Sequence, residues 1–322
     1  MEALASGLID NRRMGIGKYI KEIGRGKAGA RDLTREQATD MFGQILDGNV
    51  TDLEIGAFCL AMRIKGESAV EMAGFLDAIY ARMARIPTLG SDRPTVVIPS
   101  YNGARKLPVL TPLLALLVAR EGHPVVVHGT ATESHRVFTS DVFAALDLPI
   151  AKTLHVVQPG SLAFFPTALF HIRLQALLDA RRVVGLRNSA HSLVKLMNPC
   201  DGPCLLVTSY THPEYAISMA QTLTMMRSNA LLLRGTEGEA VADPRRAPGM
   251  QAFVHGFAQS AVAHQSGTLT ALPDVPATTD AARTASYIQA VLRGDVPVPT
   301  PIQAQVAQIL HTVMEICEPT TP

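Results

Sequence analysis

The stretch TVVIPSYNGARKLPVLTPLLALLVAREGHPVVVHGT, residues 95–130, decides the fold. It begins with an apolar β-branched run at 95–98, passes through a polar turn and continues as an apolar helical segment at 111–120. A second apolar run follows at 125–127. Both runs are unbroken and do not alternate, which predicts a parallel unit of strand, helix and strand. Because ligands bind beyond the carboxyl ends of parallel strands, we expect functional side chains in the turns that follow these runs.

Composition limits the classes of protein to which the chain can belong. With 322 residues, 47% of them hydrophobic, it holds enough apolar material for one large domain or two ordinary ones. The formal net charge of +1 gives no overall attraction for nucleic acid, so such binding would need a local basic patch. No apolar run reaches the roughly 18 residues of a membrane span, and we expect a soluble, cytoplasmic protein with no membrane partner.

The four cysteines favour reduced structural thiols over a metal site. Only Cys200 and Cys204 lie close together in the sequence, whereas Cys59 and Cys317 stand alone. Neither a second pair nor a group of histidines accompanies them, although structural zinc sites need four such ligands.

Three helix starts follow one another near the beginning of the chain. Thr34, Thr51 and Ser68 are evenly spaced, and each stands three residues before Gln or Glu, which is the pattern of a capping box. Apolar residues recur at helical spacing after each cap. Helices this short depend on packing against one another, so we expect a helical bundle over residues 1–89.

Residues 12–35 form a basic segment that precedes these helices. It holds eight Lys or Arg residues against Glu22 and Asp32, with several glycines between them. Two interpretations stay open: a solvated, partly flexible arm, or a segment that contacts a phosphate backbone.

Patterns further along the chain predict a second parallel unit and several helices. Strand 204–208, helix 213–226 and strand 230–233 should form that unit. The other expected elements are a helix at 140–146, a strand near 154–157, helices at 164–184 and 189–198, a Pro-rich linker at 296–301 and a last helix at 302–316. The expected fold class is α/β, in an α+β two-domain arrangement. Its parts are a small N-terminal helical domain at 1–89, with returning helices at about 164–198, and a larger α/β domain at 90–322 with a mainly parallel sheet.

Three long strings carry a resemblance to a known family. RRVVGLRNSAH stands at 181–191, LLLRGTEGE at 231–239 and DPRR at 243–246. Together with the order of the two domains, they resemble anthranilate phosphoribosyltransferase of glycosyltransferase family 3, and in particular its divergent TrpD2 branch. The resemblance implies a fold like that of the nucleoside phosphorylases and phosphoribosyltransferases, and a homodimer formed through the helical domain. It also implies nucleic-acid binding with little sequence preference, the property associated with the TrpD2 branch.

The catalytic motifs of the family are altered in this chain. IPSYN at 98–102 replaces a glycine-rich phosphate loop, and its proline has no amide to donate. VHGT at 127–130 lacks the family's lysine, and Phe138 replaces a glycine of another phosphate loop. Ala240 and Val241 align with the magnesium-binding Asp-Glu pair, and neither can bind a hard cation. We therefore expect no cofactor, and we expect the loss of the acids to remove charge that would repel nucleic acid.

The leading hypothesis is a homodimeric binder of single-stranded DNA or RNA that reuses the family's cleft. The cationic residues expected to reach that cleft and pair with phosphate are Arg105, Lys106, Arg136, Arg181, Arg182, Arg187, Lys195 and Arg234. Tyr101 and Phe138 are the candidates for stacking on bases, with a core position as the alternative for Phe138. The residues assigned to the ancestral ligand pocket are Asn102, Gly103, His128, Gly129, Thr139 and Arg181.

The rival hypothesis is a phosphoribosyl transferase with an altered substrate, which would use magnesium and phosphoribosyl pyrophosphate. Arg181 matches the arginine that the family associates with anthranilate, so binding of a small aromatic acid stays open. The missing magnesium acids and amide loop count against this chemistry, because it depends on stabilising the departing pyrophosphate. We assign no catalytic residue, and a purely structural dimer is a third possibility.

Overall fold

Four short helices open the structure. The computed structural model describes residues 15–26, 28–90, 93–269 and 272–317. The first helices are α1 (Gly17–Ile23), α2 (Arg35–Asp47), α3 (Asp52–Lys65) and α4 (Ala69–Tyr80). Thr34, Thr51 and Ser68 cap α2, α3 and α4, and each accepts a hydrogen bond from the amide three residues on. The three predicted capping boxes are confirmed.

The basic segment at 12–35 is not simply a flexible arm. Residues 17–23 form α1, which packs against α3 and buries Tyr19 and Ile23. These two apolar side chains give the segment a face that is stabilised by burial. Residues 12–14 and 27 lie outside the described residues, and contact of this segment with phosphate stays a prediction.

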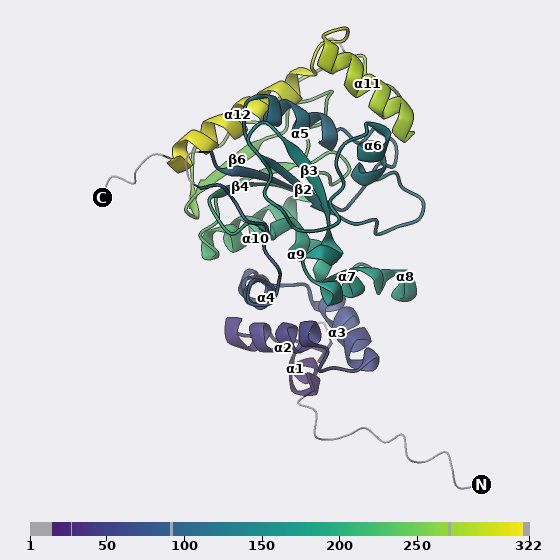
Figure 1. The fold of residues 1–322 in the computed structure, drawn as a ribbon. Helices are drawn as coiled ribbons and strands as arrows, with labels where there is room; N and C mark the ends of the chain where they lie inside the picture. Colours follow the sequence, from purple (N-terminus) through teal and green to yellow (C-terminus); the bar gives the residue numbers. More distant parts are fainter. Residues whose placement is uncertain (1–14, 27, 91–92, 270–271, 318–322) are drawn as a thin grey trace, which may run out of the picture.

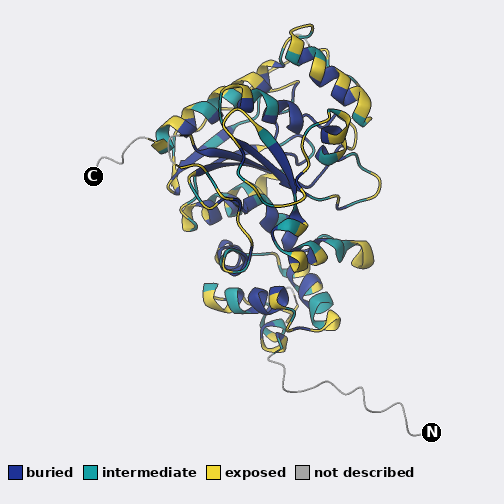
Figure 2. Cartoon of the chain, in the orientation of Figure 1, coloured by how far each residue is buried: buried dark blue, intermediate teal, exposed yellow. Residues whose placement is uncertain are grey.

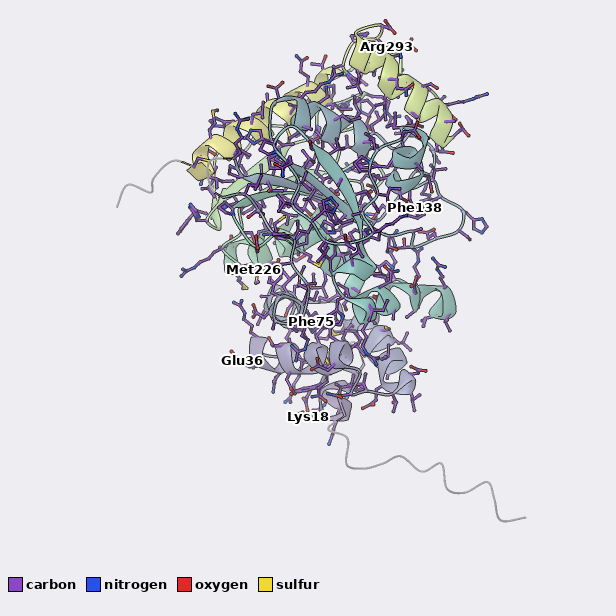
Figure 3. All side chains as sticks on the ribbon, in the orientation of Figure 1. Lys18, Glu36, Phe75, Phe138, Met226 and Arg293 are labelled. Atoms are coloured by element: carbon purple, nitrogen blue, oxygen red, sulfur yellow. The ribbon has the colours of Figure 1, made fainter. Side chains whose placement is uncertain are left out.

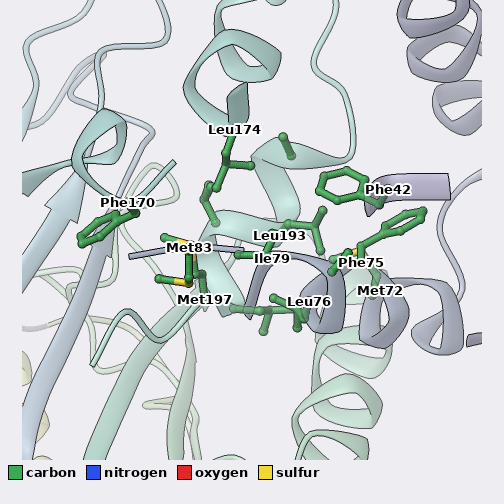
Figure 4. Close-up of a cluster of buried hydrophobic side chains, with 14 of the residues drawn as sticks. Phe42, Met72, Phe75, Leu76, Ile79, Met83, Phe170, Leu174, Leu193 and Met197 are labelled. Carbon is green, nitrogen blue, oxygen red and sulfur yellow. The ribbon is translucent and has the colours of Figure 1, made fainter. Parts of the chain in front are cut away.

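Two later helices complete the core of the helical part. They are α7 (Ile172–Asp179) and α9 (Ala190–Leu196), and they pack against α2 and α4. Figure 4 shows Leu174 and Leu193 of these helices among Phe42, Phe75 and Ile79 of the first ones. The helical part is therefore built from two segments that are far apart in the sequence, as Figure 1 also shows.

A seven-stranded sheet forms the larger part of the molecule. Its strand order is β3-β2-β1-β4-β5-β6-β7, and the pairs from β3 to β5 are parallel, whereas β6 and β7 join antiparallel. The strands are β1 (Thr95–Ser100), β2 (Val125–Gly129), β3 (Leu162–Pro166), β4 (Cys204–Tyr210), β5 (Ala230–Arg234), β6 (Met250–Val254) and β7 (Phe257–Ala258). The mainly parallel sheet predicted from unbroken apolar runs is confirmed.

Helices cover both faces of this sheet, which is why its central strands are buried (Figure 2). One apolar cluster joins the sheet to α5 (Thr111–Arg120), α6 (Thr139–Ala145), α11 (Ala281–Arg293) and α12 (Thr300–Cys317). The other joins the opposite face to α7, α9, α10 (Pro213–Met225) and the helical bundle. A strand covered on both sides needs apolar residues at every position.

Two predicted elements in the middle of the chain are wrong. Residues 154–157 lie in a loop, and the strand that pairs with β2 is β3, eight residues further on. The predicted helix at 164–184 begins instead as strand, continues as a 3-10 turn (Thr167–Leu169) and becomes helical only in α7 and α8 (Arg181–Val184). Phe164 and Phe165 belong to the apolar clusters on opposite faces of the sheet. Their side chains therefore alternate as in a strand and do not follow helical spacing. None of the described helices is long and apolar enough to cross a membrane.

We expect the substitution Phe75→Ala to lower the free energy of unfolding by about 3–5 kcal/mol, the usual cost of emptying a buried phenylalanine site. Phe75 is 0% exposed, and its ring centroid lies 4.9 Å from that of Phe42 and 6.0 Å from that of Phe58. Urea unfolding followed by circular dichroism measures this change. Val70→Ala on the outer face of the same helix, where the side chain is 37% exposed, is the control and should change stability by less than about 1 kcal/mol. Equal effects of the two substitutions would contradict this account of the core.

Candidate functional site

The loops after β1, β4 and β5 meet at one edge of the sheet. β1 and β4 are neighbours, but the chain continues from β1 toward β2 on one side and from β4 toward β5 on the other. Open parallel sheets bind ligands beyond the carboxyl ends of the strands at such a reversal. The loop at 101–110, which follows β1, therefore occupies the position where this class of sheet holds a ligand.

The carboxylate of Glu239 fills the inner part of that loop. Its Oε1 accepts hydrogen bonds from the backbone amides of Asn102 (2.7 Å) and Gly103 (2.8 Å). Its Oε2 accepts one from the hydroxyl of Thr111 (3.1 Å) and another from the hydroxyl of Ser100. The Glu239 side chain is 2% exposed, and a buried carboxylate is tolerated only when its oxygens are paired in this way.

The carboxylate of Glu237 occupies the outer part of the same loop. Its Oε2 accepts hydrogen bonds from the backbone amides of Arg105 (2.7 Å) and Lys106 (3.1 Å), and the amide of Leu107 lies 3.4 Å away. Backbone amides that converge on one place form a nest for anions. In this protein its own carboxylates occupy the nest.

Gly238 allows both carboxylates to reach the loop. Its φ of +93° lies in the region that favours glycine, and a Cβ at this position would stand 1.9 Å from Nδ2 of Asn102. We call residues 237–239, with the amides and hydroxyls that they engage, the carboxylate latch.

The replacement of the family's acidic pair by Ala240 and Val241 does not leave this region without carboxylates. Ala240 and Val241 are indeed buried in the apolar core, where they offer no metal ligand. Glu237 and Glu239, however, bring two carboxylates to the same loop. Their signal in the sequence is a pair of acids flanking a glycine soon after a buried strand, but nothing local tells which amides they will meet.

One carboxylate, that of Glu133, forms ion pairs with three of the predicted arginines. Oε1 of Glu133 lies 2.6 Å from Nη1 of Arg181, 3.2 Å from Nη2 of Arg136 and 3.4 Å from Nη2 of Arg187. We call these three arginines the arginine cluster. Burial acts in the opposite direction, but the guanidinium groups prevail and lower the pKa of Glu133. Three cations facing one anion leave positive charge in excess.

Further contacts hold the arginine cluster in place and extend it. Nη1 of Arg136 donates to the carbonyl of Asn102 (2.8 Å), which joins the cluster to the loop after β1. Arg182 is exposed and donates to the carbonyl of Ala131 (3.0 Å), in the same loop as Glu133. Three other cations of the predicted set are exposed. Arg105 and Lys106 lie in the loop that follows β1, and Arg234 is the last residue of β5. The described contacts therefore unite only part of the predicted set.

The predicted stacking roles of Tyr101 and Phe138 are wrong for this structure. Tyr101 is 2% exposed, and its hydroxyl lies 2.8 Å from Nδ1 of His128 and 3.0 Å from Oγ1 of Thr167. Phe138, which Figure 3 labels, is 4% exposed and packs closely against Gly103. Both rings are part of the core, so neither offers a free face to a base.

The residues assigned to the ancestral ligand pocket are mostly buried in this structure. Five of the six residues assigned to it lie inside the protein: Asn102, Gly103, His128, Gly129 and Thr139. A Cβ at Gly129 would stand 2.0 Å from the carbonyl oxygen of Ser100. The ends of β1 and β2 therefore approach each other too closely for a side chain at this position. Burial lowers the pKa of His128 to about 3, so its imidazole is neutral at physiological pH.

A cavity of about 480 Å³ lies between the helical part and the sheet. Residues of α3, α4, α9, α10 and the end of β4 line it. Arg187 and Lys195 of the predicted cationic set face this cavity, whereas Arg181 is not among its lining residues. Nζ of Lys195 donates to the carbonyl of Gly238 in the carboxylate latch (2.8 Å). A cleft between the two parts was expected from the family resemblance alone, because the walls of this cavity come from segments more than 100 residues apart and no local pattern predicts it.

No group of three or more His, Cys, Asp or Glu side chains is placed to hold a metal ion in the part of the chain that the structure describes. Cys200 and Cys204 are free and buried, and burial raises the pKa of Cys204 to about 12. A thiol held protonated in this way is a poor metal ligand.

Comparison with known proteins finds one matching family model and several related sequences. A family model described as the helical bundle domain of a glycosyl transferase family matches residues 18–83. YbiB, an uncharacterized protein of Escherichia coli (strain K12), is 40% identical over 298 residues, which cover 90% of this chain and 92% of YbiB. Anthranilate phosphoribosyltransferase of Methylobacterium nodulans is 31% identical over 220 residues, covering 64% of this chain and 59% of the enzyme.

Solved structures extend the likeness over nearly the whole chain. Anthranilate phosphoribosyltransferase of Thermus thermophilus matches with a TM-score of 0.67 at 20% identity, covering 94% of this chain and 88% of that one. The Saccharomyces cerevisiae enzyme in complex with PRPP and Mg matches with a TM-score of 0.67 at 14% identity, covering 93% and 88%. At these identities the likeness shows the fold alone. The high identity to YbiB over most of both chains shows more: this protein belongs to the YbiB family, a divergent branch of the proteins that share the fold of anthranilate phosphoribosyltransferase.

Proposed function

We propose that this protein binds single-stranded nucleic acid with little sequence preference. The observation that carries the proposal is the arginine cluster, in which Arg136, Arg181 and Arg187 share the single carboxylate of Glu133. Guanidinium groups pair with phosphate in a bidentate manner, and the phosphate backbone is the same whatever the base sequence. Exposed Arg182 widens this cationic surface.

The arrangement of the arginine cluster favours a charged polymer as partner. Glu133 and the carbonyl of Asn102 fix the guanidinium groups before a ligand arrives, so less side-chain entropy is lost on binding. Burial and the charges of Arg181 and Arg136 lower the pKa of Arg187, a sign of crowding among like charges. An incoming phosphate relieves that crowding.

The carboxylate latch argues against the alternative, a phosphoribosyl transferase with an altered substrate. Transfer from phosphoribosyl pyrophosphate needs amides and magnesium ligands that stabilise the departing pyrophosphate. In this chain the amides of the loop after β1 already bind Glu237 and Glu239. A pyrophosphate would have to displace both carboxylates and leave them unpaired.

We extend the proposal to a homodimer formed through the helical part. Leu53, Leu60 and Ile64 are exposed on α3 and are spaced seven and four residues apart, which places them on one side of the helix. Single exposed apolar residues are common, but an aligned set on one helix is typical of an interface. Pairing two chains would bring two arginine clusters to one strand and raise its overall affinity.

The first test reverses the charge of the cationic surface. We expect Arg181→Glu, Arg182→Glu and Arg187→Glu together to abolish binding of a labelled mixed-sequence single strand in fluorescence anisotropy. In the parent protein, the logarithm of affinity should fall with the logarithm of salt concentration by about 0.7 for each phosphate neutralised. A parallel series with duplex DNA tests the preference for single strands.

The control for that test is a second triple variant with the same change in net charge. Arg120, Arg283 and Arg293 are exposed on α5 and α11, away from α8 in Figure 1, and their replacement by Glu should leave most of the affinity intact. Equal loss in both triple variants would mean that only the total charge matters, and the arginine cluster would then not be the binding site.

The second test opens the carboxylate latch. Glu239→Ala leaves two buried amides and two hydroxyls without their acceptor, so we expect the free energy of unfolding to fall by about 3 kcal/mol or more. Inorganic phosphate should then fill the nest and raise the melting temperature of this variant, but not that of the parent, at matched ionic strength.

Glu71→Ala is the matched control for the latch. Glu71 is also a buried carboxylate that accepts two backbone amide bonds, but it lies in the helical part beside Lys65. Its removal should destabilise the protein without rescue by phosphate. Equal stabilisation of the parent and Glu239→Ala by phosphate would show that the nest is accessible in the parent, and would reopen the transferase alternative.

A further inference from the structure

The cavity between the helical part and the sheet has one wall that is rich in hydrogen-bond donors. Arg187, His191 and Lys195 line it, and the last two lie four residues apart in one helix, which places them on the same side of it. His191 and Lys195 belong to α9, and Arg187 stands just before it. Three nitrogen-bearing side chains therefore face one space of about 480 Å³, a size typical of sites for small organic ligands.

His191 is the side chain on this wall that lacks a partner. It is 7% exposed, and its Nδ1 lies within 3.3 Å of the backbone nitrogen and 3.2 Å of Oδ1 of Asn188. Its Nε2 is buried and has no hydrogen-bond partner among the described residues. Burial, with the charges of Arg187 and Arg181, lowers the pKa of His191 to about 3. Because a buried polar atom left unpaired is costly, Nε2 of this neutral ring marks a place for a polar ligand atom.

Lys195 adds positive charge to the same wall. Its ammonium donates to the carbonyls of Gly238 (2.8 Å) and Ser209 (3.4 Å), and an ammonium has three hydrogens to donate. Burial lowers its pKa to about 8, which still leaves the group mostly charged at neutral pH. These two bonds use two of the three ammonium hydrogens of Lys195, which also lines the cavity.

The facing wall, which α3, α4 and α10 provide, holds methionines together with the carboxylates of Glu67 and Glu214. Met62, Met72 and Met219 line it and are almost fully buried, and Tyr215 with His212 stands at the rim, their rings 6.3 Å apart. Thioether side chains adapt their shape and make favourable contacts with flat rings. A cavity with donors on one side and methionines on the other suits a molecule that carries a flat ring and an anionic group.

Arg187 connects this cavity to the nucleic-acid surface. It belongs to the arginine cluster through Glu133, and it also lines the cavity. A strand that lies along the arginine cluster can therefore place its terminal unit in the cavity without leaving the cationic surface. The unit that combines a flat ring with an anion at the end of such a strand is a nucleotide.

We propose that the cavity binds a nucleoside monophosphate, either free or as the terminal nucleotide of a single strand. Arg187 and Lys195 hold the phosphate, Nε2 of His191 bonds to the nucleotide, and the base lies against the methionine wall. The strand-end form rests on the nucleic-acid binding proposed above, whereas binding of the free nucleotide does not.

Isothermal titration with adenosine monophosphate tests this assignment on the intact protein. We expect one nucleotide to bind per chain, and His191→Leu to weaken that binding about tenfold, the effect of losing one buried hydrogen bond. His264→Leu is the matched control, since His264 is exposed and does not line the cavity, and it should bind as the parent does. Adenosine without phosphate should bind much more weakly.

A second variant tests the same cavity without depending on the folding of His191→Leu. Ser218 is only partly buried on α10 and lines the cavity, so Ser218→Phe fills the space from a tolerant position. We expect this variant to keep the melting temperature of the parent within a few degrees and to lose the nucleotide. Nucleotide binding that survives in Ser218→Phe would place the site elsewhere and overturn the assignment.

Further binding measurements distinguish the cavity proposal from the proposal of nucleic-acid binding. A single strand with a terminal phosphate should bind more tightly than the same strand without one, and Ser218→Phe should remove the difference. If the parent binds strands but not adenosine monophosphate, the cavity assignment fails and the nucleic-acid proposal stands. If it binds the nucleotide but no strand, the nucleic-acid proposal fails and the cavity assignment stands. Binding of 2-aminobenzoate in place of the nucleotide would also overturn the assignment.

Discussion

The interaction on which the rest of the site depends is the burial of the Glu239 carboxylate against backbone amides. It ties the loop after β5 to the loop after β1, across the point where the chain order of the sheet reverses. A buried carboxylate is stable only while its donors stay in place, so the two loops hold each other in one conformation. The loop after β1, at the edge of the sheet where comparable folds bind ligands, is thereby filled by a side chain of the protein itself.

The carboxylate latch also fixes the neighbouring surfaces. Lys195 reaches from α9 to the carbonyl of Gly238, and the hydroxyl of Ser209 donates to the same carbonyl at 2.9 Å. On the other side, Arg136 donates to the carbonyl of Asn102, whose amide binds Glu239. The cavity wall and the arginine cluster are therefore both attached to this centre, and Arg187 belongs to both. A site held by rigid elements keeps its donors in place.

The sequence predicts those parts of this structure that local patterns determine. Thr34, Thr51 and Ser68 could be recognised as caps because a capping box lies within four residues, and β1 and β2 because burial on both faces leaves a continuous apolar run. The carboxylate latch could not, since Glu239 and Asn102 are 137 residues apart and either is unremarkable alone. Tyr101 and Phe138 failed as stacking candidates for the same reason: aromatic type does not reveal which face of the fold will cover a ring.

The near-neutral charge of the chain, at first sight an argument against nucleic-acid binding, agrees with this distribution of acids. Glu237 and Glu239 are directed inward onto backbone amides, and Glu133 is shared among three guanidinium groups. Carboxylates satisfied in these ways repel a phosphate less than free ones, because the amide dipoles and guanidinium groups around them offset part of their field. The exposed cations Arg105, Lys106, Arg182 and Arg234 lie instead at the surface, where a ligand meets them first. The total charge is thus a poor guide to what the protein attracts, and the partners of each carboxylate decide where an anion can bind.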